Sequence, residues 1–89
     1  MFEWDETKRQ KNIEKHGIDF STLSLLFDGR PIITVSSTRQ DEERFASIGL
    51  IDNQFVTVIW TPRGETIRFI SARRSRDEEK RNYRQLFGG

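Results

Sequence analysis

The chain of 89 residues is predicted to fold as an α+β domain with its elements in the order α-α-β-β-β-β-α. Three observations predict this class. A charged, helix-capped segment opens the chain, four short apolar segments with turn signals between them follow, and a second charged, helix-capped segment closes it. Short links between the apolar segments predict antiparallel pairing. The length predicts a single domain that spans residues 1–89.

Capping residues predict two helices near the N-terminus. The first covers residues 5–16, because Asp5 is a favourable N-cap and Gly17 favours the left-handed conformation that ends many helices. The second covers residues 22–28, with Ser21 as its N-cap and a stripe of leucine and phenylalanine to bury. The first helix is almost entirely polar, so its packing is expected to depend on a few apolar residues and on alkyl stems.

Four strands are predicted in the central part of the chain, at residues 32–36, 44–51, 55–60 and 65–72. Turn signals at residues 52–53 and 61–64 connect the last three strands. In the last strand, alternation places Arg68 on the face opposite Ile67 and Phe69. An arginine at a strand centre is either one half of a cross-strand ion pair or a functional residue.

The closing helix is predicted to begin at Ser75 and to continue to about Leu86, because Ser75 and Glu78 match the S-x-x-E capping box. Arg73 and Arg74 stand between the last strand and this helix. Free N–H groups, the positive end of the helix dipole and two guanidinium groups together suit a phosphate. The junction is therefore a predicted anion-binding site.

Basic residues are concentrated in the last third of the chain, although the whole chain carries a net charge of only +1. Residues 61–89 contain eight basic and four acidic residues, and seven of the eight are arginines. Arginine binds phosphate in a bidentate manner and stacks on bases, so this segment favours a nucleic acid or another polyanion as the ligand. The alternative is a solvated helix surface in which neighbouring Glu and Arg side chains pair.

The composition excludes several functional classes. With no cysteine and one histidine, the chain is not expected to form a disulfide framework or a zinc site. It has no apolar run long enough to span a membrane, and its start lacks the features of a signal peptide, so a cytoplasmic protein is expected. It also lacks a Gly-rich phosphate loop and the G-x-S-x-G elbow of hydrolases.

RNA cleavage is a reaction that such a chain can perform without a metal. The 2′-hydroxyl attacks the neighbouring phosphate, while the protein orients the strand, stabilises the charged transition state and moves protons. Candidate proton carriers are Lys8, His16 and Tyr83. One polar face of the first helix carries Lys8, Asn12, Lys15 and His16. The structural alternatives are a solvated surface charge for Lys8, a residue favoured by the helix dipole for His16 and a core anchor for Tyr83.

Two blocks of the sequence together resemble the BrnT family, which comprises toxins of bacterial type II toxin–antitoxin modules. The first block lies near the N-terminus and comprises Phe2, Glu3, Trp4, Asp5, Glu6, Lys8, Asn12, Lys15, His16, Gly17 and Ile18. The second block comprises Ile48, Gly49, residues 67–74, Glu79, Arg81 and Tyr83. The resemblance extends over nearly the whole chain.

This resemblance implies a RelE-like fold, in which two N-terminal helices and a C-terminal helix pack on a four-stranded, mainly antiparallel sheet. It implies an endoribonuclease that inhibits translation, with free or ribosome-bound RNA as the substrate. It also implies a BrnA-like antitoxin with a ribbon-helix-helix DNA-binding part. The antitoxin is expected to form a heterotetramer with the toxin, so that DNA is contacted only through the antitoxin complex.

The chemistry and the resemblance together assign the candidate site residues. The catalytic candidates are Lys8, His16, Arg68, Arg73 and Tyr83. The RNA-binding candidates are Arg63, Arg74, Arg76 and Arg81. No metal site and no cofactor are expected. The alternative function is a non-catalytic module that binds nucleic acid or a partner protein and acts in transcriptional autoregulation with its antitoxin, because the sequence contains no unambiguous acid–base pair.

Overall fold

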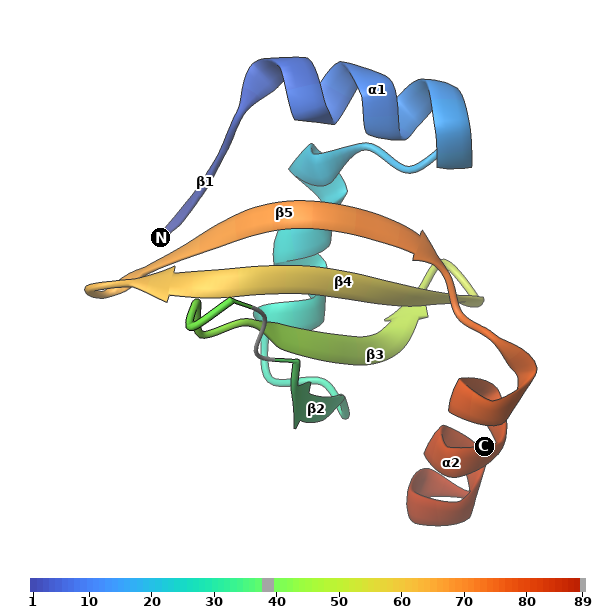
Figure 1. Cartoon of the computed structure of the whole chain (residues 1–89). Helices are drawn as coiled ribbons and strands as arrows, with labels where there is room; N and C mark the ends of the chain where they lie inside the picture. Colours follow the sequence, from blue (N-terminus) through green and yellow to red (C-terminus); the bar gives the residue numbers. More distant parts are fainter. Residues whose placement is uncertain (38–39, 89) are drawn as a thin grey trace.

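A mixed β-sheet with helices on both of its faces forms the part of the chain that the structure, a computed structural model, describes (Figure 1). This part comprises residues 1–37 and 40–88. In chain order its elements are β1 (Phe2–Trp4), α1 (Glu6–His16), the 3₁₀-helix η1 (Phe20–Phe27), β2 (Ile33–Ser36), β3 (Phe45–Ile51), β4 (Gln54–Arg63), β5 (Thr66–Arg74) and α2 (Asp77–Phe87). The strand order is β1-β5-β4-β3-β2, and only the β1–β5 pair is parallel.

The predicted sheet of four mainly antiparallel strands, preceded by two helices, is wrong. A fifth strand, β1, precedes α1 and pairs in parallel with β5, so that Phe2 lies opposite Ile67 and Trp4 lies opposite Phe69. Three residues are too few to show an alternating pattern, and the partner strand is distant in sequence. Aromatic packing stabilises the pairing, because the Phe2 and Trp4 rings lie 5.4 and 6.0 Å from the Phe69 ring.

The second predicted helix is a 3₁₀-helix, η1, and its N-cap is Asp19 instead of Ser21. The Asp19 carboxylate accepts a hydrogen bond from the Ser21 N–H at 2.9 Å. Phe20, Leu23 and Leu26 are spaced three residues apart, which is the repeat of a 3₁₀-helix, and all three are fully buried. This spacing places the three side chains in one row against the sheet.

The first predicted helix is confirmed as α1, and Asp5 and Gly17 cap it as predicted. Its one buried residue is Asn12. The Asn12 side-chain amide donates to the Ile18 carbonyl at 2.9 Å, and its oxygen accepts from the Ala72 N–H at 3.0 Å. Because β1 ends before this point of β5, Asn12 provides the hydrogen bond that a longer β1 would make. The polar face of α1 therefore lies along the free edge of β5.

The two faces of the sheet are covered differently. One face packs against η1 and holds the main core, which includes Phe20, Val58 and Phe69. The other face is covered at one end by α2, which leaves the sheet at the end of β5 (Figure 1). The buried Tyr83 anchors α2, because its ring packs against Phe55 at 5.3 Å. No helix in the described residues has the length and apolar character needed to cross a membrane.

A bulge in β5 decides which side chains reach the second face. The pairing between β4 and β5 shifts by one residue at Ile70, which has no partner on β4. Phe69 and Ala72 therefore both lie in the core, although they are three positions apart. Strict alternation from Phe69 would place Arg73 on the core face as well. The bulge instead directs Arg73 to the second face, where it lines a pocket.

Candidate active site at the junction of β5 and α2

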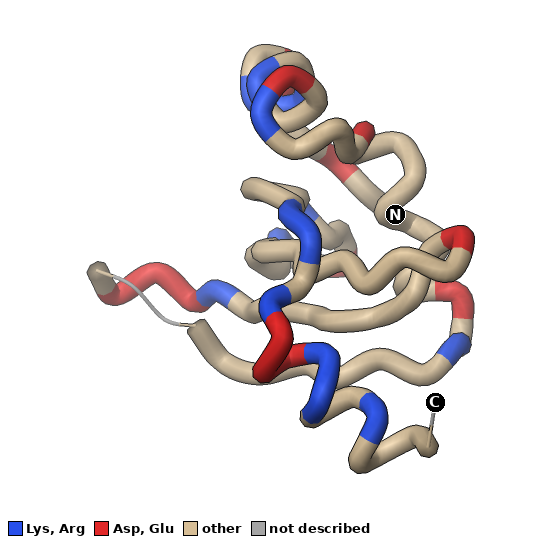
Figure 2. Tube along the Cα trace, turned by 90° about the vertical axis from the view of Figure 1, so that its right-hand side faces the viewer, with Lys and Arg blue, Asp and Glu red and all other residues tan. Residues whose placement is uncertain are grey.

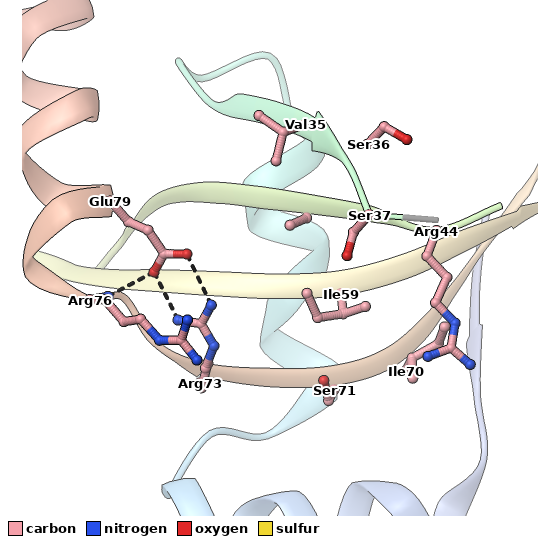
Figure 3. A pocket seen from close by; sticks show the side chains of 11 residues that line it. Val35, Ser36, Ser37, Arg44, Ile59, Ile70, Ser71, Arg73, Arg76 and Glu79 are labelled. Atoms are coloured by element: carbon pink, nitrogen blue, oxygen red, sulfur yellow. Dashed lines mark hydrogen bonds and ion pairs between the residues drawn. The ribbon is translucent and has the colours of Figure 1, made fainter. Parts of the chain in front are cut away.

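Arg73 and Glu79 form the central contact of this junction (Figure 3). Arg73 Nη1 donates to Glu79 Oε1 at 2.8 Å, and Nη2 donates to Oε2 at 2.9 Å. The same carboxylate accepts hydrogen bonds from the Arg76 N–H at 2.7 Å and from the Thr57 hydroxyl at 3.0 Å. One carboxylate thus joins β5, β4 and the start of α2.

The Glu79 carboxylate is ionised at neutral pH. Its hydrogen bonds from Arg73 are the largest cause of a pKa lowered to about 2, and the bonds from Arg76 and Thr57 lower it further, while burial opposes them. The same contact raises the pKa of Arg73. Glu79 and Arg73 therefore form a permanent ion pair, and neither group exchanges a proton near neutral pH.

The helix cap of α2 is displaced by one residue from its predicted place. The predicted capping box joined Ser75 to Glu78, but the N-cap is Arg76 and its N–H is bound by Glu79. Ser75 still belongs to the end of the sheet, because its N–H donates to the Phe55 carbonyl at 3.0 Å. The buried Ser75 hydroxyl shares a hydrogen bond of 2.7 Å with a strand hydroxyl, that of Thr57 on β4. Because these contacts hold Ser75 in the sheet, α2 begins further along the chain than predicted.

A pocket of about 450 Å³ lies beside the ion pair on the second face of the sheet (Figure 3). Its apolar lining includes Val35, Ala46, Ile59 and Ile70. Its charged lining comprises Arg44, Arg73, Arg76 and Glu79. Three guanidinium groups against one carboxylate give the pocket an excess of positive charge, which suits an anion that also carries an apolar or aromatic part.

The three arginines of the pocket differ in their partners. Arg44 pairs with Glu42 at 2.8 Å, and Arg73 pairs with Glu79. The Arg76 guanidinium forms no ion pair within the residues that the structure describes, and Arg76 is exposed. Arg76 is therefore the lining arginine whose charge is available to a ligand without the loss of an existing contact.

Figure 2 shows Lys and Arg positions on α1, above the sheet, and a run of basic and acidic positions where the chain passes from β5 into α2. Lys8, Lys15 and His16 precede or follow the buried Asn12 by three or four positions, so they flank it on the helix face turned toward β5. Lys8 and Lys15 are exposed, and His16 is half-buried. The edge of β5 that leads to the pocket is thus bordered by side chains that can carry positive charge.

The model of one known protein family matches most of the chain. The model of the BrnT family, described as the ribonuclease toxin of a type II toxin–antitoxin system, matches residues 4–79. The chain belongs to the BrnT family. Comparison with curated proteins gives no significant match. Membership confirms the resemblance seen in the sequence and makes the protein a ribonuclease toxin whose module includes an antitoxin partner.

The matched BrnT segment includes the basic residues of α1 as well as the junction of β5 and α2. Lys8 and His16 on α1 lie within it, as do Arg73 and the pocket residue Arg76. Tyr83, in contrast, follows the matched segment. The structure gives its hydroxyl a structural partner, since it donates to the Pro31 carbonyl at 3.1 Å.

Other predicted residues do not line the pocket. Arg68 pairs with Glu3 of β1 at 2.6 Å, which is the cross-strand ion pair named above as the structural alternative. Arg68 is roughly 15 Å from Arg73 along β5, given the rise of a strand. Arg63 ends β4 at the opposite end of the β4–β5 hairpin, roughly 25 Å along the strands from the junction.

Two further predicted RNA-binding residues do not line the pocket. Arg74 ends β5, and its side chain donates a hydrogen bond to the side-chain oxygen of Gln54. Arg81 is exposed on α2. RNA binding by either residue stays a prediction.

Two of the charged pocket residues, Glu79 and Arg44, were not among the predicted site residues. Glu79 stands six positions after Arg73 and on a different element, so helix or strand periodicity does not indicate their contact. The sequence places Glu79 in the second block that resembles the BrnT family, but gives it no catalytic or binding role. Arg44 precedes β3 and lines the pocket at the end away from Glu79 (Figure 3). The pairing of β3 with β4 places Phe45 opposite Trp60, and the Arg44 side chain extends from this end of β3 to line the pocket.

Among the described residues, no group of three or more His, Asp or Glu side chains is arranged to hold a metal ion.

Proposed function

We propose that this BrnT-family chain is a metal-independent endoribonuclease that cleaves RNA at the pocket beside Arg73 and inhibits translation. The observation that supports this proposal is the gathering of Arg44, Arg73 and Arg76 around an apolar pocket at the junction of β5 and α2. Single-stranded RNA offers phosphates to the guanidinium groups and exposed bases to the apolar lining.

The proposed reaction uses a nucleophile that the substrate carries. The 2′-oxygen bonds to the adjacent phosphorus, and the bond from phosphorus to the 5′-oxygen breaks. A 2′,3′-cyclic phosphate and a free 5′-hydroxyl result. A base takes the proton of the 2′-hydroxyl, and an acid protonates the leaving oxygen. Guanidinium groups stabilise the charge that grows on the non-bridging oxygens, and no step requires a metal ion.

The residues divide into proposed roles according to their surroundings. Arg73 and Arg76 are proposed to bind the scissile phosphate, because they line the pocket next to each other. His16 and Lys8 are proposed as the proton carriers, because they flank the edge of β5 from α1. Glu79 is not an acid catalyst at neutral pH, since its pKa is about 2.

Structural roles are proposed for two residues that the sequence had placed in the catalytic set. Arg68 holds β1 to β5 through its ion pair with Glu3. Tyr83 holds α2 to the sheet through its ring contact with Phe55 and its hydrogen bond to Pro31. Arg74 and Arg81 are proposed to contact RNA phosphates other than the one that is cleaved.

Cleavage of free RNA by the purified protein in the presence of EDTA tests the proposal. Products that end in 2′,3′-cyclic phosphate are expected. Arg76→Ala is expected to slow cleavage by about 100-fold, the order of magnitude for the loss of one group that stabilises the transition state. Arg63→Ala removes the same charge well beyond the screening length, so it serves as the matched control and is expected to change the rate less than about twofold.

Each other outcome has a defined meaning. Cleavage that depends on an added divalent metal would contradict metal independence. Cleavage only with translating ribosomes would restrict the substrate to ribosome-bound RNA. Absence of cleavage in both assays, together with normal growth of cells that express the protein alone, would favour the non-catalytic binding module.

The antitoxin partner is proposed to be BrnA-like, with a ribbon-helix-helix part that contacts DNA for the whole complex. The pocket carries an excess of positive charge, so acidic segments of the antitoxin are expected to cover it and exclude RNA. A heterotetramer is the proposed assembly, and the cytoplasm is the proposed compartment. Light scattering of the co-expressed pair measures the assembly, and loss of RNA cleavage on addition of the antitoxin measures the inhibition.

A further inference from the structure

Glu79 lines the pocket, and its contacts indicate a role that goes beyond helix capping. Its carboxylate receives hydrogen bonds from β5, β4 and the start of α2, through Arg73, Thr57 and the Arg76 N–H. The side chains of Glu79 and Arg73 are only 20% and 26% exposed. A carboxylate held from three elements has one orientation, and it transmits that orientation to the guanidinium it binds.

The contact leaves part of the Arg73 guanidinium available to a ligand. Nη1 donates to Glu79 and, at 3.3 Å, to the Arg74 carbonyl, so both of its hydrogens are engaged. Nη2 uses one hydrogen for Glu79. A guanidinium has five N–H donors, so Nε and the second Nη2 hydrogen have no partner among the residues that the structure describes. These two lie on the same side of the group and form a second fork that matches two oxygens of a phosphate.

We propose that Glu79 is a positioning residue of the nuclease site, which fixes the free fork of Arg73 for the scissile phosphate and at the same time weakens RNA binding through its own negative charge. This inference rests on the proposed function, because it assumes that the pocket binds the phosphate that is cleaved. Pre-orientation of the guanidinium favours turnover. The carboxylate lies next to the bound phosphate, and two like charges at such a distance repel each other.

Glu79 thus favours turnover but weakens RNA binding. A merely structural role does not produce effects of opposite sign on these two quantities. Glu79→Gln keeps the size of the side chain and removes its charge. We expect it to bind RNA about tenfold more tightly and to cleave bound RNA at least about tenfold more slowly. Release of Arg73 for one further phosphate contact is also expected to steepen the dependence of log K on log salt by about 0.7, the value for single strands.

Glu78→Gln is the matched control, because Glu78 is the preceding residue, is exposed and has the same charge. It is expected to leave both constants and the salt dependence within about twofold of the wild type. Glu79→Asp separates charge from geometry, since it keeps the charge but shortens the reach to Arg73. It is expected to slow turnover without a change in the salt dependence, and it still tests the inference if Glu79→Gln does not fold.

Two measurements on the full chain provide these values. Fluorescence anisotropy with a 2′-O-methyl RNA, which lacks the nucleophile, gives the affinity at several salt concentrations. Single-turnover cleavage of the matching RNA gives the rate for bound substrate. Absence of cleavage by the wild type, both with free RNA and with translating ribosomes, overturns the proposed function. Cleavage by the wild type, together with equal effects of Glu79→Gln and Glu78→Gln or a loss of both affinity and turnover in folded Glu79→Gln, overturns this inference alone.

Discussion

Asn12→Ala is expected to destabilise the fold strongly, although Asn12 is a polar residue in an almost entirely polar helix. The substitution leaves two backbone groups without a partner, the Ala72 N–H and the Ile18 carbonyl. Ala72 is fully buried and Ile18 is 7% exposed, so water reaches neither group freely. An unsatisfied buried polar group costs about 1–3 kcal/mol. For two such groups the free energy of unfolding is therefore expected to fall by about 2–6 kcal/mol, a large part of the stability of a small domain.

Urea denaturation followed by circular dichroism measures this change. Glu14→Ala is the control, because Glu14 is an exposed residue of the same helix and its replacement is expected to change stability by less than about 0.5 kcal/mol. Thermal unfolding gives a second measure, since 1 kcal/mol shifts the midpoint by about 4–8 °C in a domain of this size. Equal stabilities of Asn12→Ala and Glu14→Ala would refute the role assigned to Asn12 at the free edge of β5.

Two further predictions concern the junction. Because folding lowers the pKa of Glu79 from 4.5 to about 2, its contribution to stability is complete above pH 4.5 and is lost as the pH falls toward 2. Glu79→Gln is therefore expected to flatten the acid limb of the stability profile, as measured by urea midpoints across this range, and an unchanged slope would contradict the assigned ion pair. Tyr83→Phe is expected to retain RNA cleavage and to lose about 1 kcal/mol of stability, because its hydroxyl donates to Pro31. A folded Tyr83→Phe protein without activity would instead make Tyr83 a proton carrier.

Local signals in the sequence were sufficient wherever one short segment specifies its own conformation. Asp5 and Gly17 set the ends of α1, because a side-chain acceptor and a left-handed residue act on neighbouring backbone groups. The turn at residues 52–53 has positive φ at both positions, as the signal there predicts. The family blocks in the sequence were likewise sufficient to indicate BrnT, and the family match confirms it.

The same local signals failed where a partner outside the segment decides the conformation. Serine is a favoured N-cap residue, but the N–H and the hydroxyl of Ser75 form hydrogen bonds with Phe55 and Thr57 of β4. The helix α2 therefore begins later than predicted. Three residues of β1 carry no recognisable pattern, and only the rings of Phe2 and Trp4 on Phe69 make them a strand. The buried residues of η1 repeat every three positions, as in a 3₁₀-helix. Over eight residues this spacing differs little from that of an α-helix, so the sequence does not distinguish the two.

Local sequence signals specify the capped helix at the start of the chain and the turn at residues 52–53, and the sequence also shows the arginine-rich end and the family, whereas the predicted turn at residues 61–64 is wrong because β4 continues to Arg63. Only the tertiary structure decided which arginines share a site. The bulge at Ile70 turns Arg73 to the second face, and the start of α2 brings Glu79 against it. Arg68, on the same strand, is used instead to hold β1. Strand register and helix docking bring distant side chains together, and neither is encoded by the residues next to those side chains.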